Sequence, residues 1–116
     1  MKGFSIVITL LLLVFSAQAQ VLSVKEQAVT INEVLTDRIE NLLPKLMDEA
    51  KIDCWLIISR EYNEDPILKT FLPAEWLSAR RTTMLVFYRD KKNESIHSYA
   101  IARYQVGKRI QAAWNP

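Results

Sequence analysis

The chain has 116 residues, which is enough for one small domain. Fifteen Lys and Arg against thirteen Asp and Glu give a formal net charge of +2, so the charge balance gives no reason to expect nucleic acid as a partner. A single cysteine excludes an internal disulfide, and the fold must therefore depend on core packing alone.

The amino-terminal residues 1–19 have the three parts of a secretory signal peptide. Lys2 supplies the positive start, residues 4–15 form the apolar stretch, and residues 17–19 are a small-x-small cleavage sequence. The apolar stretch is shorter than the roughly 20 residues that a membrane-spanning helix needs. We therefore expect cleavage and export to the periplasm or beyond, without membrane association afterwards. A retained membrane anchor is the alternative.

A helix is predicted after a loosely held lead-in of residues 20–30. Across residues 31–50 the apolar positions recur with a helical period, and charged residues fall mostly on the opposite face. Asn32 or Thr30 is the expected cap at its start. Pro44 conflicts with the pattern because it lacks an N–H group and clashes one turn back. We expect a single kinked helix, with a break into two helices as the alternative.

A short apolar run at residues 54–58 predicts a buried strand. Cys54 begins this run and is expected to act as a small hydrophobe rather than a nucleophile. A short helix is predicted to begin at residues 64–65, where acidic groups favour a helix start, and to end before Pro73. A helix followed by a turn and a buried strand indicates an α/β fold rather than a helical bundle.

Two further strands are predicted in the second half of the chain. Residues 82–88 are rich in β-branched and aromatic side chains, and residues 96–106 alternate in character after a polar loop at residues 90–94. Gly107 marks a turn, and residues 110–114 begin a further element. The positions expected on one face of the third strand are Ile96, Ser98, Ala100, Ala102 and Tyr104.

The polar block between the first two strands is the strongest candidate for a site, because loops between rigid elements often carry function. Glu61, Glu64 and Asp65 form either an acid/base cluster or, as we prefer, structural caps and a partner for an arginine. Arg80 and Arg81 either clamp an anion or, as we prefer, make ion pairs or face solvent.

Other residues with chemical potential are more easily explained as structural. His97 is the only histidine and has no second metal ligand at a recognisable spacing, so we interpret it as an ordinary strand residue. Trp55, Trp76 and Trp114 are expected to pack in the core or at an interface.

Six strings of residues together carry a resemblance to a known family. The strings are residues 42–47, 52–53, 58–66, 68–70, 72–74 and 76–81. They resemble the amino-terminal domain of exported Xaa-Pro aminopeptidase-like proteins, which belong to the creatinase/prolidase/methionine aminopeptidase (M24) metallopeptidase family. The similarity extends from about residue 29 to residue 116, and residues 60–66 and 76–81 are its most specific parts.

The resemblance implies a partial ribonuclease-H-like fold, with a mixed sheet and flanking helices, over residues 31–116. In that family a separate carboxy-terminal "pita-bread" domain performs catalysis with two divalent metal ions, held by two Asp, one His and two Glu. No residue of this chain corresponds to those ligands. The resemblance therefore implies a truncated, non-catalytic domain without a cofactor of its own.

In that family, the amino-terminal domain helps to form the wall of the substrate entrance and often contributes to subunit contacts. By resemblance, this role falls on Arg60, Glu61, Tyr62, Asn63, Glu64, Asp65, Trp76, Arg80 and Arg81. The expected partners are a second copy or a full-length relative, bound through an open sheet edge, or a peptide. A freestanding binding module is the second hypothesis, and a small enzyme using the acidic cluster is the third.

Overall fold

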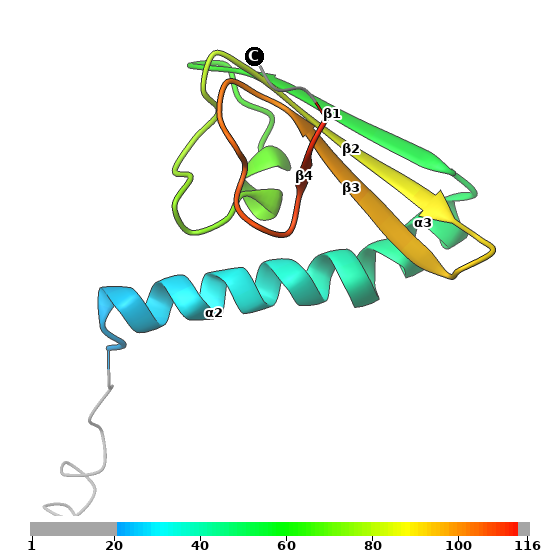
Figure 1. Ribbon diagram of the computed structural model, residues 1–116, viewed down its shortest axis with the longest axis horizontal. Helices are drawn as coiled ribbons and strands as arrows, with labels where there is room; N and C mark the ends of the chain where they lie inside the picture. The colour runs from blue at the N-terminus through cyan, green and yellow to red at the C-terminus, as the bar shows by residue number, and fades with distance from the viewer. Residues whose placement is uncertain (1–20, 114–116) are drawn as a thin grey trace, which may run out of the picture.

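The computed structural model describes residues 21–113, so the predicted signal peptide and Trp114 lie outside the described part. The protein has an α/β fold, with one 27-residue helix and an open, mixed, four-stranded sheet. This architecture confirms the predicted fold class at the level of an α/β protein with a mixed sheet. The helix runs along one face of the sheet, as Figure 1 shows.

The long helix begins earlier than the sequence analysis predicted. Its first part, α2, spans Val24–Asp37, and Ser23 and Glu26 form a reciprocal capping box at its start. The prediction of a loose lead-in followed by a helix start at residue 31 is therefore wrong. Asn32, one of the two predicted caps, instead accepts a hydrogen bond from the backbone N–H of Ala74 at 3.0 Å.

A π-helical turn, η1 (Arg38–Leu42), follows α2, and α3 (Leu43–Ala50) completes the helix. Pro44 directly follows this π-helical turn, so its missing N–H group falls where the regular α-helical bonding pattern is already interrupted. The N–H group of Leu43 bonds to the carbonyl of Arg38, a π-helical spacing. The prediction of one helix is confirmed, and the π-turn is the irregularity that accommodates Pro44.

The π-turn also keeps one apolar stripe directed at the sheet. The buried side chains Leu35, Ile39, Leu43 and Met47 recur at a spacing of four residues. In a regular α-helix such a stripe drifts around the axis by about 40° per step. One extra residue in a π-turn offsets about 100° of that drift, so all four side chains face the core.

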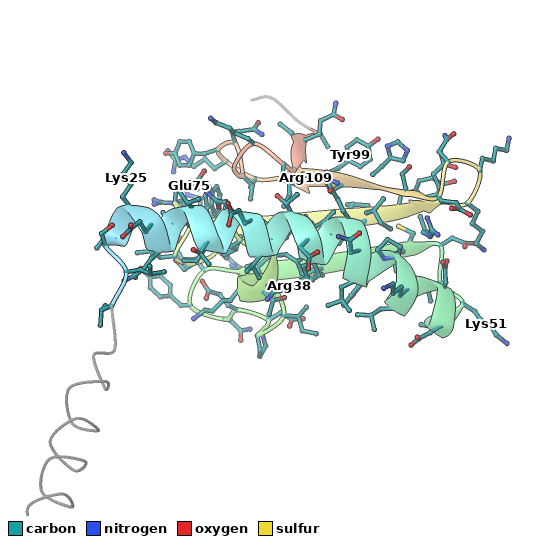
Figure 2. All side chains as sticks on the ribbon, turned by 90° about the horizontal axis from the view of Figure 1, so that it is seen from below. Lys25, Arg38, Lys51, Glu75, Tyr99 and Arg109 are labelled. Atoms are coloured by element: carbon teal, nitrogen blue, oxygen red, sulfur yellow. The ribbon has the colours of Figure 1, made fainter. Side chains whose placement is uncertain are left out.

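Two arginines hold the π-turn from opposite sides. Arg38 donates a hydrogen bond to the carbonyl of Thr70, and Arg109 Nε lies 3.2 Å from Glu40 Oε1. Figure 2 shows Arg38 and Arg109 on the two sides of the helix. These contacts connect the middle of the helix with the segment before β2 and with the segment after β3.

The sheet has the strand order β1–β2–β3–β4. The strands are β1 (Cys54–Arg60), β2 (Thr82–Asp90), β3 (Ser95–Ile101) and β4 (Gln111–Ala112). The first three are antiparallel neighbours, whereas β4 pairs in parallel with β3. The predicted strands are confirmed, but the third ends at Ile101 rather than at residue 106.

The helix covers the inner face of this sheet. Alternate residues of each strand point toward it, and Leu85 and Phe87 of β2 are fully buried. The residues predicted to share one face of the third strand are buried up to Ala102, whereas Tyr104 lies beyond the strand and is 54% exposed. A 3₁₀ turn, η2 (Leu68–Phe71), fills the space beside β1, and Phe71 packs edge-on against Trp55 at 6.0 Å.

The outer face of the sheet is apolar and lies open to solvent within residues 21–113. Leu56 and Ile58 of β1 are 50% and 55% exposed, and Tyr88 of β2 and Ile101 of β3 are 49% and 38% exposed. The prediction that β1 is a buried strand is therefore wrong for its outer face. Cys54 is also exposed rather than buried.

The segment between β1 and β2 is less helical than predicted. Only Leu68–Phe71 forms a 3₁₀ turn, and Leu72 returns to an extended conformation before Pro73. The predicted turn at Gly107 is confirmed, with a φ of +61°. A Cβ atom at this position would lie 2.9 Å from Cγ of Pro73, so glycine fits both the dihedral angle and the space.

Candidate functional site

The candidate site is one end of the sheet, formed by residues 60–66 and 76–81, which we call the polar tip. A tight turn follows β1, in which the N–H group of Asn63 donates to the carbonyl of Arg60 at 2.9 Å. Tyr62 occupies this turn with a φ of +66° and is 97% exposed. A left-handed conformation costs a non-glycine residue about 1 kcal/mol, so the turn presents the tyrosine ring to solvent at a conformational cost.

Glu61 and Arg81 join the two segments of the tip. The N–H group of Glu61 donates to the carbonyl of Arg81 at 2.6 Å, and the N–H group of Arg81 donates to Oε2 of Glu61 at 3.1 Å. Arg81 is also left-handed, with a φ of +53°. This reciprocal pair lies directly beyond the last β1–β2 pair, Arg60 and Thr82, so it extends the sheet register into the loops.

Glu64 makes a second connection between the same segments. Its Oε1 accepts a hydrogen bond from the N–H group of the buried Ala79 at 2.7 Å, and its Oε2 lies 3.7 Å from Nζ of Lys69. The Glu64 side chain is only 14% exposed. Glu64 therefore fixes the position of the loop after Trp76. The sequence analysis predicted that Glu64 caps a helix, and this prediction is wrong.

Asp65 organises the entry to η2. Its Oδ1 accepts a hydrogen bond from the N–H group of Ile67 at 2.8 Å, and its own N–H group donates to Oγ of Ser59 at 3.0 Å. All three acidic residues of the tip thus accept hydrogen bonds from backbone N–H groups. This geometry supports the structural interpretation of the acids over their use in acid/base chemistry.

The three arginines of the tip differ from its acids in their contacts. No ion pair within residues 21–113 involves Arg60, Arg80 or Arg81. Cζ of Arg80 lies 5.9 Å from the ring centroid of Trp76, a cation–π distance. Trp76 is 8% exposed and donates from Nε1 to the carbonyl of Gln105 at 3.1 Å, so it forms a rigid base for Arg80.

An open hollow of about 550 Å³ lies beside the acidic residues of the tip. The residues that line it are Glu61, Tyr62, Glu64, Pro66, Lys69 and Ser78. The hollow has a mixed lining, with one aromatic ring, one lysine and two carboxylates that are already bonded to backbone N–H groups.

Sequence reasoning missed two buried hydroxyl groups that support the tip. Ser59 and Thr83 are 2% and 0% exposed, and they lie opposite each other on β1 and β2. Thr83 Oγ1 accepts a hydrogen bond from the N–H group of Arg80 at 3.2 Å. In the same way, Ser59 Oγ accepts a hydrogen bond from the N–H group of Asp65 at 3.0 Å. The sequence did contain a signal for these buried hydroxyl groups, because each is a polar residue at an inward position of an apolar strand.

The remaining candidates lie apart from the tip. His97 is an exposed residue of β3, stacked between Tyr88 and Tyr99 at centroid distances of 6.3 and 6.5 Å. Its Nε2 lies 3.6 Å from Oδ2 of Asp90. In the part of the chain that the structure describes, no three His, Cys, Asp or Glu side chains are grouped to hold a metal ion.

The fold and the tip define a small α/β protein with an open mixed sheet and a polar loop surface at one end. No protein-family model matches the chain, and no curated protein and no solved structure matches it either. Among residues 21–113, no helix has the length and apolar character needed to cross a bilayer.

Proposed function

We propose that this chain is an exported, non-catalytic domain similar to the amino-terminal domain of Xaa-Pro aminopeptidase-like proteins of the M24 family. In this proposal the polar tip shapes a substrate entrance or a contact with a neighbouring subunit. The mixed sheet corresponds to a partial ribonuclease-H-like domain of the creatinase type. The two metal ions of the family belong to a catalytic domain outside this chain.

The observation that carries the proposal is the way Glu61 and Arg81 join the two strings on which the resemblance most depends. Residues 60–66 and 76–81 are separated along the chain, yet they form a single surface through Glu61–Arg81 and Glu64–Ala79 hydrogen bonds. The carboxylates already accept hydrogen bonds from backbone N–H groups. The side chains that this surface can offer to a partner are therefore its arginines and the exposed Tyr62. Tyrosine and arginine are enriched where proteins meet each other.

A freestanding interaction module is the second candidate function. The apolar outer face of the sheet favours it, because residues such as Leu56 and Ile58 are half exposed. Large exposed apolar patches in soluble proteins commonly mark interaction surfaces. In this alternative the chain acts by binding a protein or peptide, without a catalytic partner.

The direct test uses the purified chain with peptides that begin with Xaa-Pro, in the presence of Mn²⁺. The proposal expects no hydrolysis above the buffer background. Measurable hydrolysis would contradict it, and loss of that hydrolysis in a Glu61→Gln variant would instead support an enzyme built on the acidic cluster. The reading frame after Pro116 is a second test, because continuation into the Asp, Asp, His, Glu, Glu ligand pattern would show that the chain comes from a truncated or split gene.

A mixing experiment tests the supporting role. The chain is added to a separately produced catalytic domain of an exported M24 aminopeptidase, and the KM for a peptide substrate is measured. We expect the chain to lower KM and the Arg80→Ala/Arg81→Ala variant to lose most of this effect. A matched variant, Lys25→Ala/Lys45→Ala, removes the same charge from the exposed helix surface and should behave as the unmodified chain. Binding without any change in KM would favour the freestanding module.

A further inference from the structure

A second hollow, beside α2, carries an inference beyond the proposed function, because none of its lining residues belongs to the polar tip. We call it the helix-side hollow. Its volume is about 330 Å³, and its wall comes from three segments, which are α2, residues 73–75 and residues 106–109. Figure 2 shows two of its lining residues, Glu75 and Arg109, on the same side of the helix. Pockets for small ligands have volumes of about 300–1,000 Å³.

Hydrogen bonds between distant segments hold the wall of this hollow. The side-chain oxygen of Asn32 accepts a hydrogen bond from the N–H group of Ala74 at 3.0 Å, which connects α2 with the segment before the tip. Gln105 donates from Nε2 to the carbonyls of Gly107 and Ile110 at 2.9 and 3.0 Å, so the third segment closes on itself. The wall is therefore preformed, and a preformed site lowers the cost of binding a ligand.

The most buried residues of the wall are apolar. Leu35 of α2 and Val106 are 4% and 1% exposed, and Pro73 is also buried. A Cβ atom at Gly107 would lie 2.9 Å from Cγ of Pro73 and 3.7 Å from Oε1 of Glu75, so glycine leaves open the space between these two residues. The inner part of the hollow therefore suits an apolar group of a ligand.

The charged groups of the wall have opposite signs and do not pair with one another. In the described part of the chain no ion pair involves Glu75 or Lys108, although both line the hollow. Arg109 bonds from Nε to Oε1 of Glu40 at 3.2 Å and from Nη1 to Oγ of Ser98 at 3.1 Å. A guanidinium group has five N–H donors, so three donors of Arg109 are available to a ligand.

We propose that the helix-side hollow binds a zwitterionic dipeptide. The ammonium group of the ligand faces Glu75, and its carboxylate faces Lys108 and the available N–H groups of Arg109. An apolar side chain of the ligand covers Leu35 and Val106. A ligand with both charges is favoured because the wall offers both, whereas a simple anion would meet the carboxylate of Glu75.

The spacing of the charged groups fits the length of a dipeptide. Oε1 of Glu75 lies beside the Cβ position of Gly107, and Arg109 follows two residues later. Cα atoms two residues apart are separated by at most about 7 Å. In a dipeptide the ammonium group and the carboxylate flank two Cα atoms, so its charged ends have a similar separation. In a single amino acid both groups are attached to one Cα atom and lie closer together.

An NMR titration of the isotope-labelled chain with the dipeptide Ala-Leu tests the proposal. We expect saturable shifts of the backbone amides of Leu35, Gly107 and Arg109, with a Kd on the order of 1 mM for so small a ligand. N-acetyl-Ala-Leu lacks the ammonium group and Ala-Leu amide lacks the carboxylate, so each should bind about tenfold more weakly. Equal binding of the three compounds, or no saturable shift with Ala-Leu, would overturn the proposal.

Two single variants at exposed positions assign the charged groups. Glu75→Gln should bind Ala-Leu and N-acetyl-Ala-Leu equally weakly, because it removes only the contact with the ammonium group. Lys108→Gln should reduce the difference between Ala-Leu and its amide, with Arg109 retaining part of it. The matched control Lys45→Gln/Glu49→Gln makes the same charge changes on the exposed surface of α3 and should bind as the unmodified chain does. Unchanged binding in both single variants would contradict the proposed contacts.

The Arg80→Ala/Arg81→Ala variant separates this site from the polar tip. It should bind Ala-Leu with an unchanged Kd, because neither arginine lines the helix-side hollow. Loss of binding in this variant would move the dipeptide to the tip and overturn the inference of a second site. Failure of the mixing experiment on the polar tip, by contrast, would leave the binding of Ala-Leu unaffected.

Discussion

The guanidinium group of Arg89 makes a bidentate ion pair with the carboxylate of Asp48. Nε lies 3.1 Å from Oδ1 and Nη2 lies 2.9 Å from Oδ2. Arg89 points from β2 to the inner face, where its side chain is only 9% exposed, and Asp48 lies in the last turns of α3. The pair therefore fixes the end of the helix against the sheet, at the opposite end of β2 from the polar tip.

This ion pair predicts a loss of stability in acid. The hydrogen bonds from Arg89 are the main cause that lowers the pKa of Asp48 below its usual value. Because the folded pKa lies below the unfolded one, the carboxylate stabilises the fold above about pH 4, and the contribution is lost as pH falls through the folded pKa. We expect urea unfolding of Asp48→Asn to depend less on pH below 4 than the unmodified chain does.

The control for the acid prediction is Glu33→Gln, which removes an exposed helix carboxylate. It should keep the pH dependence of the unmodified chain. In every variant the free energy of unfolding still depends on pH to some extent, because the hydrogen bond from Asn93 also lowers the pKa of Asp90. Identical slopes for Asp48→Asn and Glu33→Gln would show that the ion pair contributes nothing.

Two neighbouring residues of α3 test the apolar stripe of the helix. Met47 is fully buried, whereas Leu46 is 44% exposed. Met47→Ala should lower the free energy of unfolding by about 2–5 kcal/mol, because it leaves a cavity against the sheet. Leu46→Ala should cost less than about 1 kcal/mol. Chemical denaturation measures both, and similar losses would argue against the helix orientation described above.

Glu64 tests the connection between the two segments of the tip. Glu64→Ala leaves the buried N–H group of Ala79 without its acceptor and should lower the free energy of unfolding by about 1–3 kcal/mol. Glu64→Gln keeps an oxygen at the same place and should cost less. Hydrogen exchange of the Ala79 amide gives a local readout, since protection should fall in the alanine variant first. Unchanged protection in Glu64→Ala would contradict the assigned bond.

Gly107 tests the turn that brings β4 back to the sheet. Gly107→Ala places a Cβ atom 2.9 Å from Pro73 at a left-handed φ, and it should destabilise the fold by about 1–3 kcal/mol. Lys108→Ala, an exposed neighbour, should change stability by less than about 0.5 kcal/mol. Thermal unfolding of the two variants provides the comparison, and equal melting temperatures would be inconsistent with the turn geometry.

Local patterns predicted most of the elements. The helical period of residues 31–50 and the β-branched run of residues 82–88 both led to correct elements. The helix start at Val24 was missed, although Ser23 and Glu26 have the spacing of a capping box. That segment is mostly exposed, so its apolar residues do not mark a buried face and the helical period gave no signal.

The candidate site was predictable as a set of residues but not as an arrangement. The density of charge identified residues 60–66 and 76–81. The bonds between Glu61 and Arg81 depend on the register of β1 against β2, and that register is set by which side chains of each strand face the helix. Likewise, the apolar run of residues 54–58 is compatible with both a central strand and an edge strand, so the sequence pattern does not distinguish the two.

The sequence by itself determined an α/β protein with one long helix, three main strands and a charged loop region, because these features follow from local periodicity and composition. Only the tertiary structure decided that β1 lies at the border of the sheet, with its outer side chains in solvent. It also decided that the acids of the tip bond to backbone N–H groups while its arginines remain available. Both outcomes depend on pairing between distant segments, which local sequence does not encode.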